Sequence, residues 1–135
     1  MRRYEELETD DGVMVRYRRH DNGGGLVAPS AAVDASTWVA ETAWIDPEVR
    51  VGADVRVGEH SWLERGALVG RGARLGSHVH LGRGAKVGAG ARIGAHVEVA
   101  AGARIPPGAV VAAETRVAAA PEEKARTTRR FRLAA

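Results

Sequence analysis

The sequence predicts an all-β protein whose short parallel strands wind into about five triangular coils, and three observations support this prediction. An aliphatic residue stands at every sixth position from Val27 to Val117 without exception. From the second repeat on, the residue two positions earlier is small or β-branched, as Ala85 is before Val87. Glycine commonly follows the aliphatic residue, as at Gly88. A period of six fits neither a helical stripe nor a heptad, but it fits short strands of period two separated by tight turns.

Each repeat accounts for one strand and one corner. In the repeat that contains Val87, the side chains of Ala85 and Val87 point inward, Lys86 points outward, and Ala89 and Gly90 make the turn. Such a repeat cannot bury an apolar face alone, so neighbouring repeats stack and share one core. Three repeats, or 18 residues, complete a triangular coil. At about 4.8 Å per stacked strand, the prism is roughly 25 Å tall.

Residues 1–25 precede the repeats and are expected to cap the open end of the prism. Val13, Val15 and Tyr17 alternate with Met14, Arg16 and Arg18, which predicts one strand, and a glycine-rich turn follows it. His20 lies beside this turn and is expected to be a solvated loop histidine. The end of a solenoid must be covered, because otherwise its open strands pair with another molecule.

The repeats occupy residues 26–118 without interruption, and residues 119–135 follow them. Pro121 and Glu122 are typical of a helix start, and Arg126 can pair with Glu122 one turn later. We therefore expect a short C-terminal helix before a basic tail.

Composition excludes several classes of protein. The chain has no cysteine, so it has neither disulfides nor thiolate zinc ligands nor a cysteine nucleophile. No apolar run is long enough for a membrane span and the N-terminus lacks the apolar core of a signal peptide, so we expect a cytoplasmic protein. The net charge is +3, but acids stand among the basic residues and no basic run alternates with aromatics. We therefore expect neither a nucleic-acid partner nor a membrane partner.

The unbroken six-residue repeat resembles the hexapeptide-repeat family over about two thirds of the chain. Proteins of this family fold as a left-handed parallel β-helix, so the resemblance implies the handedness of the coil. It also implies a threefold homotrimer with sites between protomers. The family includes acyltransferases and γ-class carbonic anhydrases. Acyltransferases of this fold often extrude a long loop from one corner, and no repeat here is long enough to contain one.

A column of histidines is the first candidate site. His60, His78 and His96 are 18 residues apart, so the coil stacks them at one corner, where the other two corners carry glycine over the same coils. This turn position requires a left-handed backbone, which histidine tolerates better than most residues. The histidines can therefore be turn fillers, but three of them at one corner favour a functional role.

The next wall carries Trp44, Trp62, His80 and Glu98 in its outward column. Tryptophan has a large apolar area and dominates the energetics of many interfaces. We therefore expect Trp44, Trp62 and His80 to lie at a subunit interface.

The first functional hypothesis is an acyltransferase. His78 or His60, with His96 in the same column, would act as general base on an acceptor hydroxyl or amine, since the ordinary pKa of histidine is about 6.5. The donor would be acetyl-CoA or another acyl-CoA, as a substrate and not as a tightly bound cofactor.

The phosphates of this donor would bind to arginines. Arg56, Arg74 and Arg92 form an outward column on the wall that precedes the histidine corner, and Lys86 and Arg104 form a second cationic column on another wall. The sequence leaves both columns open as the phosphate site.

Two alternatives remain. The γ-class carbonic anhydrases bind zinc through three histidines from two subunits, and the residues available here would be His60, His78, His80 and His96. The chain lacks that family's histidines five apart and its Arg-Gly-Asp turn, so no family ligand can be carried over. The other alternative is a non-catalytic trimeric scaffold or ligand-binding protein, which the shortness of the chain and the missing loop favour.

Overall fold

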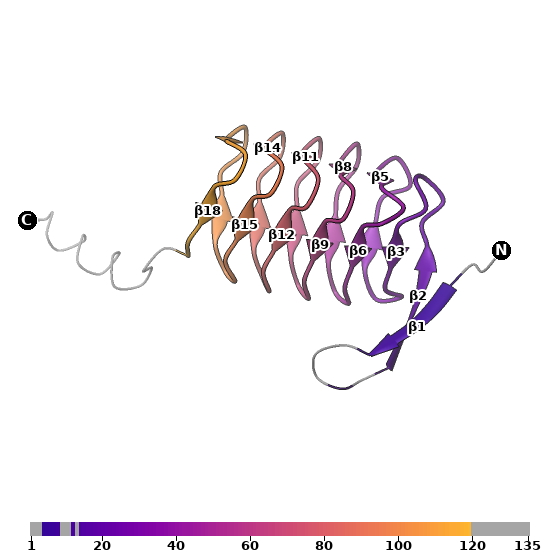
Figure 1. Cartoon of the computed structure of the whole chain (residues 1–135). Coiled ribbons are helices and arrows are strands. Elements are labelled where there is room, and N and C mark those ends of the chain that lie inside the picture. Colours follow the sequence, from indigo (N-terminus) through magenta and orange to yellow (C-terminus); the bar gives the residue numbers. More distant parts are fainter. Residues whose placement is uncertain (1–3, 9–11, 13, 120–135) are drawn as a thin grey trace, which may run out of the picture.

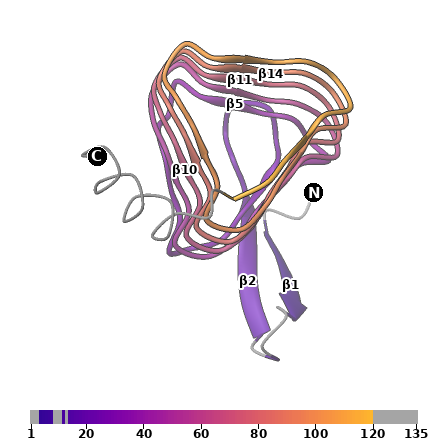
Figure 2. The same ribbon diagram turned by 90° about the vertical axis from the view of Figure 1, so that its left-hand side faces the viewer.

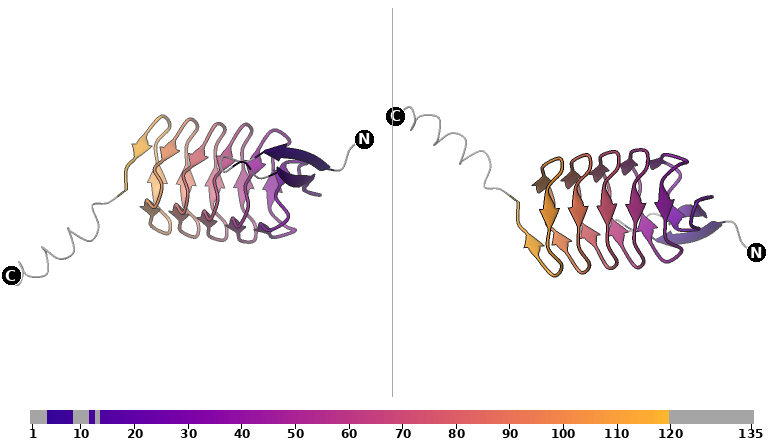
Figure 3. Two further views of the ribbon diagram at one scale, coloured as in Figure 1. Left: turned by 90° about the horizontal axis from the view of Figure 1, so that it is seen from below. Right: turned by 90° about the horizontal axis from the view of Figure 1, so that it is seen from above.

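The computed structural model describes residues 4–8, 12 and 14–119. In Figure 1 these residues form a prism of stacked coils with an antiparallel hairpin at its N-terminal end. Sixteen two-residue strands, β3 to β18, follow one another every six residues and divide among three walls, which gives about five coils. Figure 3 shows the same regular stack from two further sides. The fold predicted from the repeat is confirmed.

Wall A is the sheet that also includes the N-terminal hairpin. In spatial order it consists of β1 (Tyr4–Glu8), β2 (Met14–Arg19), β3 (Leu26–Val27), β6 (Trp44–Ile45), β9 (Trp62–Leu63), β12 (His80–Leu81), β15 (Glu98–Val99) and β18 (Arg116–Val117).

Walls B and C have five parallel strands each. Wall B consists of β4 (Ala32–Val33), β7 (Arg50–Val51), β10 (Leu68–Val69), β13 (Lys86–Val87) and β16 (Arg104–Ile105). Wall C consists of β5 (Trp38–Val39), β8 (Arg56–Val57), β11 (Arg74–Leu75), β14 (Arg92–Ile93) and β17 (Val110–Val111).

The coil is left-handed. Figure 2 looks along the prism from its C-terminal end, so later coils lie nearer the viewer. The chain passes from β10 at the left to β11 at the top, which is clockwise as it advances toward the viewer. A clockwise advance toward the viewer defines a left-handed coil, as the family resemblance implied.

The core is a thin column of aliphatic side chains. In the strands of the central coils the second residue is buried and the first is exposed or half-buried, as Lys86 and Val87 are in β13. Leu63, Leu81 and Val99 lie one above another in wall A and are fully buried. Because identical layers repeat, each aliphatic residue packs on its equivalents in the coils before and after it.

Glycine serves two purposes at the corners. A Cβ atom on Gly88 would lie 2.3 Å from the backbone nitrogen of Pro107 in the next coil, so the close stacking of coils requires glycine there. At Gly90 a Cβ atom would meet nothing within 4 Å, but the φ angle of +71° favours glycine. The first position depends on space and the second on backbone conformation.

The N-terminal hairpin is joined to wall A by backbone pairing. β1 pairs antiparallel with β2, and β2 pairs antiparallel with β3 through Arg18 and Arg19. The hairpin extends away from the prism in Figures 1 and 2. The predicted strand is thus present as β2, beginning at Met14. β2 gives β3 a hydrogen-bonded neighbour. The boundary between the N-terminal segment and the repeats at residue 25 stays a prediction.

His20 differs from expectation. Its Nε2 atom lies 2.9 Å from the carbonyl oxygen of Thr37, and the residue is half-buried. The prediction of a solvated loop histidine is therefore wrong, because the turn folds back onto the first coil.

The predicted C-terminal helix lies almost wholly at residues 120–135, outside the described residues. In the described part of the chain no helix is long and apolar enough to cross a membrane.

Tyr17 attaches the hairpin to the prism, and its titration gives a test of this attachment. The side chain is fully buried and its hydroxyl donates a hydrogen bond to Asp46 Oδ1 at 2.8 Å. Burial raises the pKa of Tyr17 to about 12, and the charge of Asp46 acts in the same direction. In the unfolded chain tyrosine ionises near pH 10. Between these pH values the unfolded state has lost the proton and the native state retains it, so stability falls as the pH rises.

We expect the free energy of unfolding to decrease between pH 10 and pH 12 more steeply in the wild type than in Tyr17→Phe, and this difference to be absent below pH 10. Urea unfolding of both proteins at a series of alkaline pH values measures it, and the other titrating groups are common to both. Parallel pH dependences would show that the Tyr17 hydroxyl is not held protonated by its surroundings.

Candidate functional site

The structure brings the three predicted histidines together at the corner between walls C and A. The ring centroids of His60 and His78 are 4.8 Å apart, and those of His78 and His96 are 4.5 Å apart. The φ angles of the three residues are 57° to 59°, so each occupies the left-handed region that the turn requires. Their side chains are exposed. The backbone thus fixes a stack of three solvent-exposed imidazoles.

The backbone amides hold this column from coil to coil. The N–H of His60 donates to Thr42 Oγ1 at 2.8 Å, that of His78 to the carbonyl of Glu59 at 2.8 Å, and that of His96 to the carbonyl of Ser77 at 2.9 Å. The ring positions therefore follow from the stacking of the coils. Among the described residues no hydrogen bond to a carboxylate orients these three rings.

The stacked rings do not converge on a metal position within one chain. His78 and His96 are nearly parallel, with an interplanar angle of 10°. The lone pairs of imidazole lie in the ring plane, so those of parallel rings run side by side, whereas zinc needs nitrogens that converge at about 2.0–2.1 Å. In the described ranges no group of three or more histidine, aspartate or glutamate side chains could hold a metal ion. A zinc site that includes His80 would therefore need ligands from a neighbouring copy.

His80 belongs to a different environment from the column. Its ring stacks on Trp62 with centroids 4.8 Å apart. Its Nε2 atom lies 2.5 Å from Glu64 Oε2, and its Nδ1 atom lies 3.6 Å from Glu98 Oε2. Both ring nitrogens thus face carboxylates, which hold the ring in place.

Sequence reasoning missed Glu64 and Asp46. Asp46 accepts hydrogen bonds from the Tyr17 hydroxyl at 2.8 Å and from Trp62 Nε1 at 2.9 Å. Both acids follow an inward aliphatic residue, at a position where most later repeats have glycine. This departure from the repeat was a signal that could have identified them.

The two tryptophans of wall A are half-buried within a single chain. Tyr17 packs edge-on against Trp44 at 5.7 Å, and Trp44 lies 6.4 Å from Trp62. Although both indoles belong to the outward column, the N-terminal strand and neighbouring coils therefore cover much of them. Their place at a subunit interface, with His80, stays a prediction.

The arginine ladder lies on wall C. Arg56, Arg74 and Arg92 are paired in register on β8, β11 and β14, and all three are exposed. The guanidinium carbon of Arg56 lies 4.4 Å from the centroid of the Trp38 ring. This wall is next to the histidine corner, as the sequence predicted.

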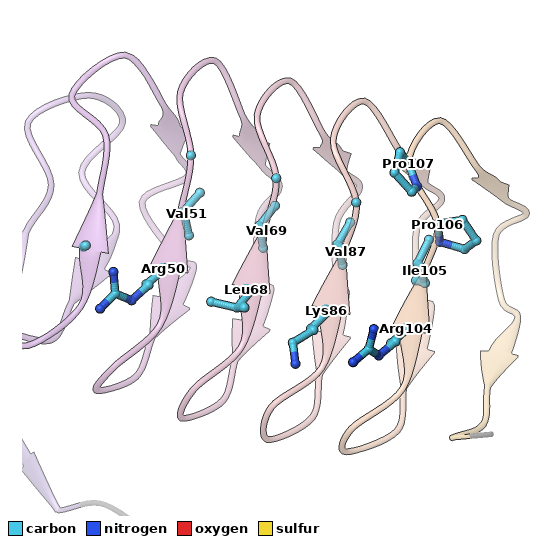
Figure 4. A pocket seen from close by; sticks show the side chains of 14 residues that line it. Arg50, Val51, Leu68, Val69, Lys86, Val87, Arg104, Ile105, Pro106 and Pro107 are labelled. Atoms are coloured by element: carbon cyan, nitrogen blue, oxygen red, sulfur yellow. The ribbon is translucent and has the colours of Figure 1, made fainter. Parts of the chain in front are cut away.

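A shallow groove of about 570 Å³ lies on wall B. Figure 4 shows the side chains of Arg50, Lys86 and Arg104 extending from β7, β13 and β16 to the same side, with Leu68 on β10 between the first two. The described residues that line the groove include no carboxylate. They are Ala32, Arg50, Val51, Gly52, Leu68, Val69, Gly70, Lys86, Val87, Gly88, Arg104, Ile105, Pro106 and Pro107. The groove is therefore apolar along its length and cationic at one side.

The groove and the histidine column lie on opposite sides of the prism. The column occupies the corner between walls C and A, whereas the groove is on wall B. The three walls form a triangle in Figure 2, so this corner faces away from wall B. One chain cannot bring His78 to a ligand in its own groove.

Comparison with known proteins assigns no family to the chain. No protein-family model matches the chain, and no curated protein matches it. A solved structure of serine acetyltransferase isoform 3 from Entamoeba histolytica, in complex with cysteine, is similar over 63% of this chain with 20% identity and a TM-score of 0.41. The matched part is 33% of that enzyme, so the chain spans about a third of its length. The six-residue period and the left-handed parallel coil themselves fit the hexapeptide-repeat β-helix superfamily.

Proposed function

We propose that the protein is an acyltransferase that binds an acyl-CoA donor in the wall B groove and uses a histidine of the corner column as general base. The groove carries this proposal, because it combines an apolar length with Arg50, Lys86 and Arg104 and contains no lining carboxylate. It favours Lys86 and Arg104, the second of the two columns expected from the sequence, over Arg56, Arg74 and Arg92 as the phosphate site.

The chemistry of the groove matches the parts of such a donor. Arginine binds phosphate oxygens in a bidentate manner and lysine acts as a point charge. Lys86 and Arg104 are register partners on neighbouring strands, so their side chains start from backbones about 4.8 Å apart. Leu68 and the aliphatic lining can contact the acyl-bearing chain of the donor, in the way that ligand pockets commonly combine apolar walls with a few polar groups.

His78 is the proposed base. It lies in the centre of the stack, between His60 and His96, and its side chain is exposed. In the reaction its ring accepts the proton of an acceptor hydroxyl or amine while the acceptor atom attacks the thioester carbonyl, and the CoA thiolate leaves with the proton returned to it. His80 is less suited to this role, because carboxylates face both of its ring nitrogens.

The site is proposed to form between copies of the chain. Because the corner with His78 faces away from the groove of its own chain, the base must come from a neighbour, and a homotrimer repeats this contact three times. The proposal places the protein in the cytoplasm, as we expect from the sequence.

A second candidate is a trimeric scaffold or ligand-binding protein without catalysis. One observation favours it: every repeat from β3 to β18 has six residues, so no corner extrudes a loop that could form an acceptor site. The same experiments separate the two candidates.

We expect CoA and acetyl-CoA to raise the melting temperature of the protein. A ligand that binds only the native state stabilises it by about 2.7 kcal/mol at one hundred times its Kd. The double variant Lys86→Ala/Arg104→Ala should lose this increase, whereas Arg74→Ala, at the same outward position on wall C, should retain it. No increase in the wild type would favour the scaffold, and a loss of stability on adding chelator would favour a zinc protein.

The proposed base is tested by thiol release from acetyl-CoA with a panel of hydroxyl and amine acceptors. His78→Asn should slow release, since asparagine accepts the left-handed backbone but not the proton. Mixed trimers of His78→Asn and Lys86→Ala/Arg104→Ala chains should regain activity. In such a trimer the first chain supplies an intact wall B groove and the second supplies the histidine base. Absence of recovery would contradict a site shared between copies.

A further inference from the structure

The arginine ladder on wall C has no role in the proposed reaction and no compensation in its own wall. Arg56, Arg74 and Arg92 occupy the outward position of three consecutive strands. Like charges directly opposite on neighbouring strands destabilise a sheet. Within the described residues none of the three forms an ion pair. The wall thus maintains an uncompensated row of positive charge.

Wall A shows how the same fold compensates charge. There Glu98 lies between two basic neighbours in its outward column, with Oε1 at 3.3 Å from Arg116 Nη2 and Oε2 at 3.6 Å from His80 Nδ1. The outward column of wall C contains Trp38, the three arginines and Val110, with no acid among them. The difference between the two walls indicates that the partner of the ladder is not a side chain of this wall.

The acids of the two flanking corners lie toward the ends of the wall. The preceding corner carries Asp34 and Asp54 in the first two coils and Arg71 in the third, and the following corner carries Glu41, Glu59 and Glu114 besides the histidine column. Directly beside Arg74 and Arg92 the flanking corners carry no acid. The uncompensated positive charge is therefore centred on Arg74 and Arg92.

We infer that wall C binds a linear polyanion of the polyphosphate class along the axis of the prism. Three arginines on strands about 4.8 Å apart can bind successive phosphates of a flexible chain. A nucleic acid fits less well, because single strands need aromatic faces on which bases stack, and the one indole of this wall, Trp38, is already covered by Arg56. This inference does not depend on the acyltransferase proposal, which uses wall B.

The test is a titration of the full-length protein with inorganic polyphosphate at several salt concentrations. For a single-stranded polyanion the logarithm of the affinity falls with the logarithm of the salt concentration, by about 0.7 for each phosphate neutralised. Arg74→Gln should bind about tenfold more weakly, because one charge-assisted contact is lost. Its salt slope should be smaller by about 0.7.

Matched variants give the test its specificity. Arg83→Gln removes the same charge from an exposed position at the corner between walls A and B and should leave polyphosphate affinity at the wild-type value, while Arg74→Lys should retain most of it. Equal losses from Arg74→Gln and Arg83→Gln, or no binding at low salt, would overturn the inference. So would equal affinity for a single-stranded oligonucleotide of the same charge. Loss of CoA binding in the wall B double variant with polyphosphate binding intact separates the two proposals.

Discussion

Replacing Gly88 by alanine should destabilise the protein by about 4 kcal/mol or more, which is exceptional for one methyl group. The added Cβ atom would lie 2.3 Å from the nitrogen and 2.6 Å from the Cα atom of Pro107. These are backbone atoms of the next coil, so no side chain can rotate away. The two coils would have to separate, which would break the hydrogen bond from Gly88 N to Ile105 O at 2.8 Å. Urea unfolding followed by circular dichroism measures the loss.

Gly90→Ala is the matched control, two residues away on the same corner. A Cβ atom there would meet nothing within 4 Å, so only the φ angle of +71° opposes alanine. A left-handed alanine costs roughly 1–2 kcal/mol. Equal losses in the two variants would show that coil spacing is not what requires glycine at Gly88.

Trp62→Ala should have the second largest effect, about 3 kcal/mol in the free energy of unfolding. The indole stacks on His80 with centroids 4.8 Å apart and donates from Nε1 to Asp46 Oδ2 at 2.9 Å. Alanine removes the stack and the donor together. Trp62→Phe keeps an aromatic ring and loses the N–H, so its smaller loss would separate the two contributions. A stability equal to that of the wild type in Trp62→Ala would contradict the role of this aromatic column.

The same variant tests the predicted interface. If Trp62 also lies between protomers, Trp62→Ala should weaken the trimer and shift the sedimentation profile toward smaller species. Arg116→Ala provides a control, because Arg116 is exposed on the last strand of the same wall. A sedimentation profile like that of the wild type would contradict the prediction that Trp62 lies at a subunit interface.

The sequence by itself determined the coil, because its period leaves few alternatives. Residues 18 apart must share a face once three repeats close a triangle. The stack of His60, His78 and His96 and the ladder of Arg56, Arg74 and Arg92 therefore followed from counting. The left-handed turns at these corners followed from residue type. Six glycines fall at the same position of the repeat as the three histidines, and all nine residues have positive φ in the structure; the glycines are Gly66, Gly72, Gly84, Gly90, Gly102 and Gly108.

Only the tertiary structure decided how the walls differ. Asp46 contacts Trp62 and Glu64 contacts His80, and the two residues of each pair are 16 positions apart in the sequence. These contacts join neighbouring coils and depend on the rotamers of the side chains. The burial of Trp44 depends on Tyr17, which comes from an antiparallel strand outside the repeat. The wall B groove depends on how far Arg50, Lys86 and Arg104 extend from their strands. A period in the sequence specifies which side chains face outward, but their directions and their cover depend on neighbours that no period encodes.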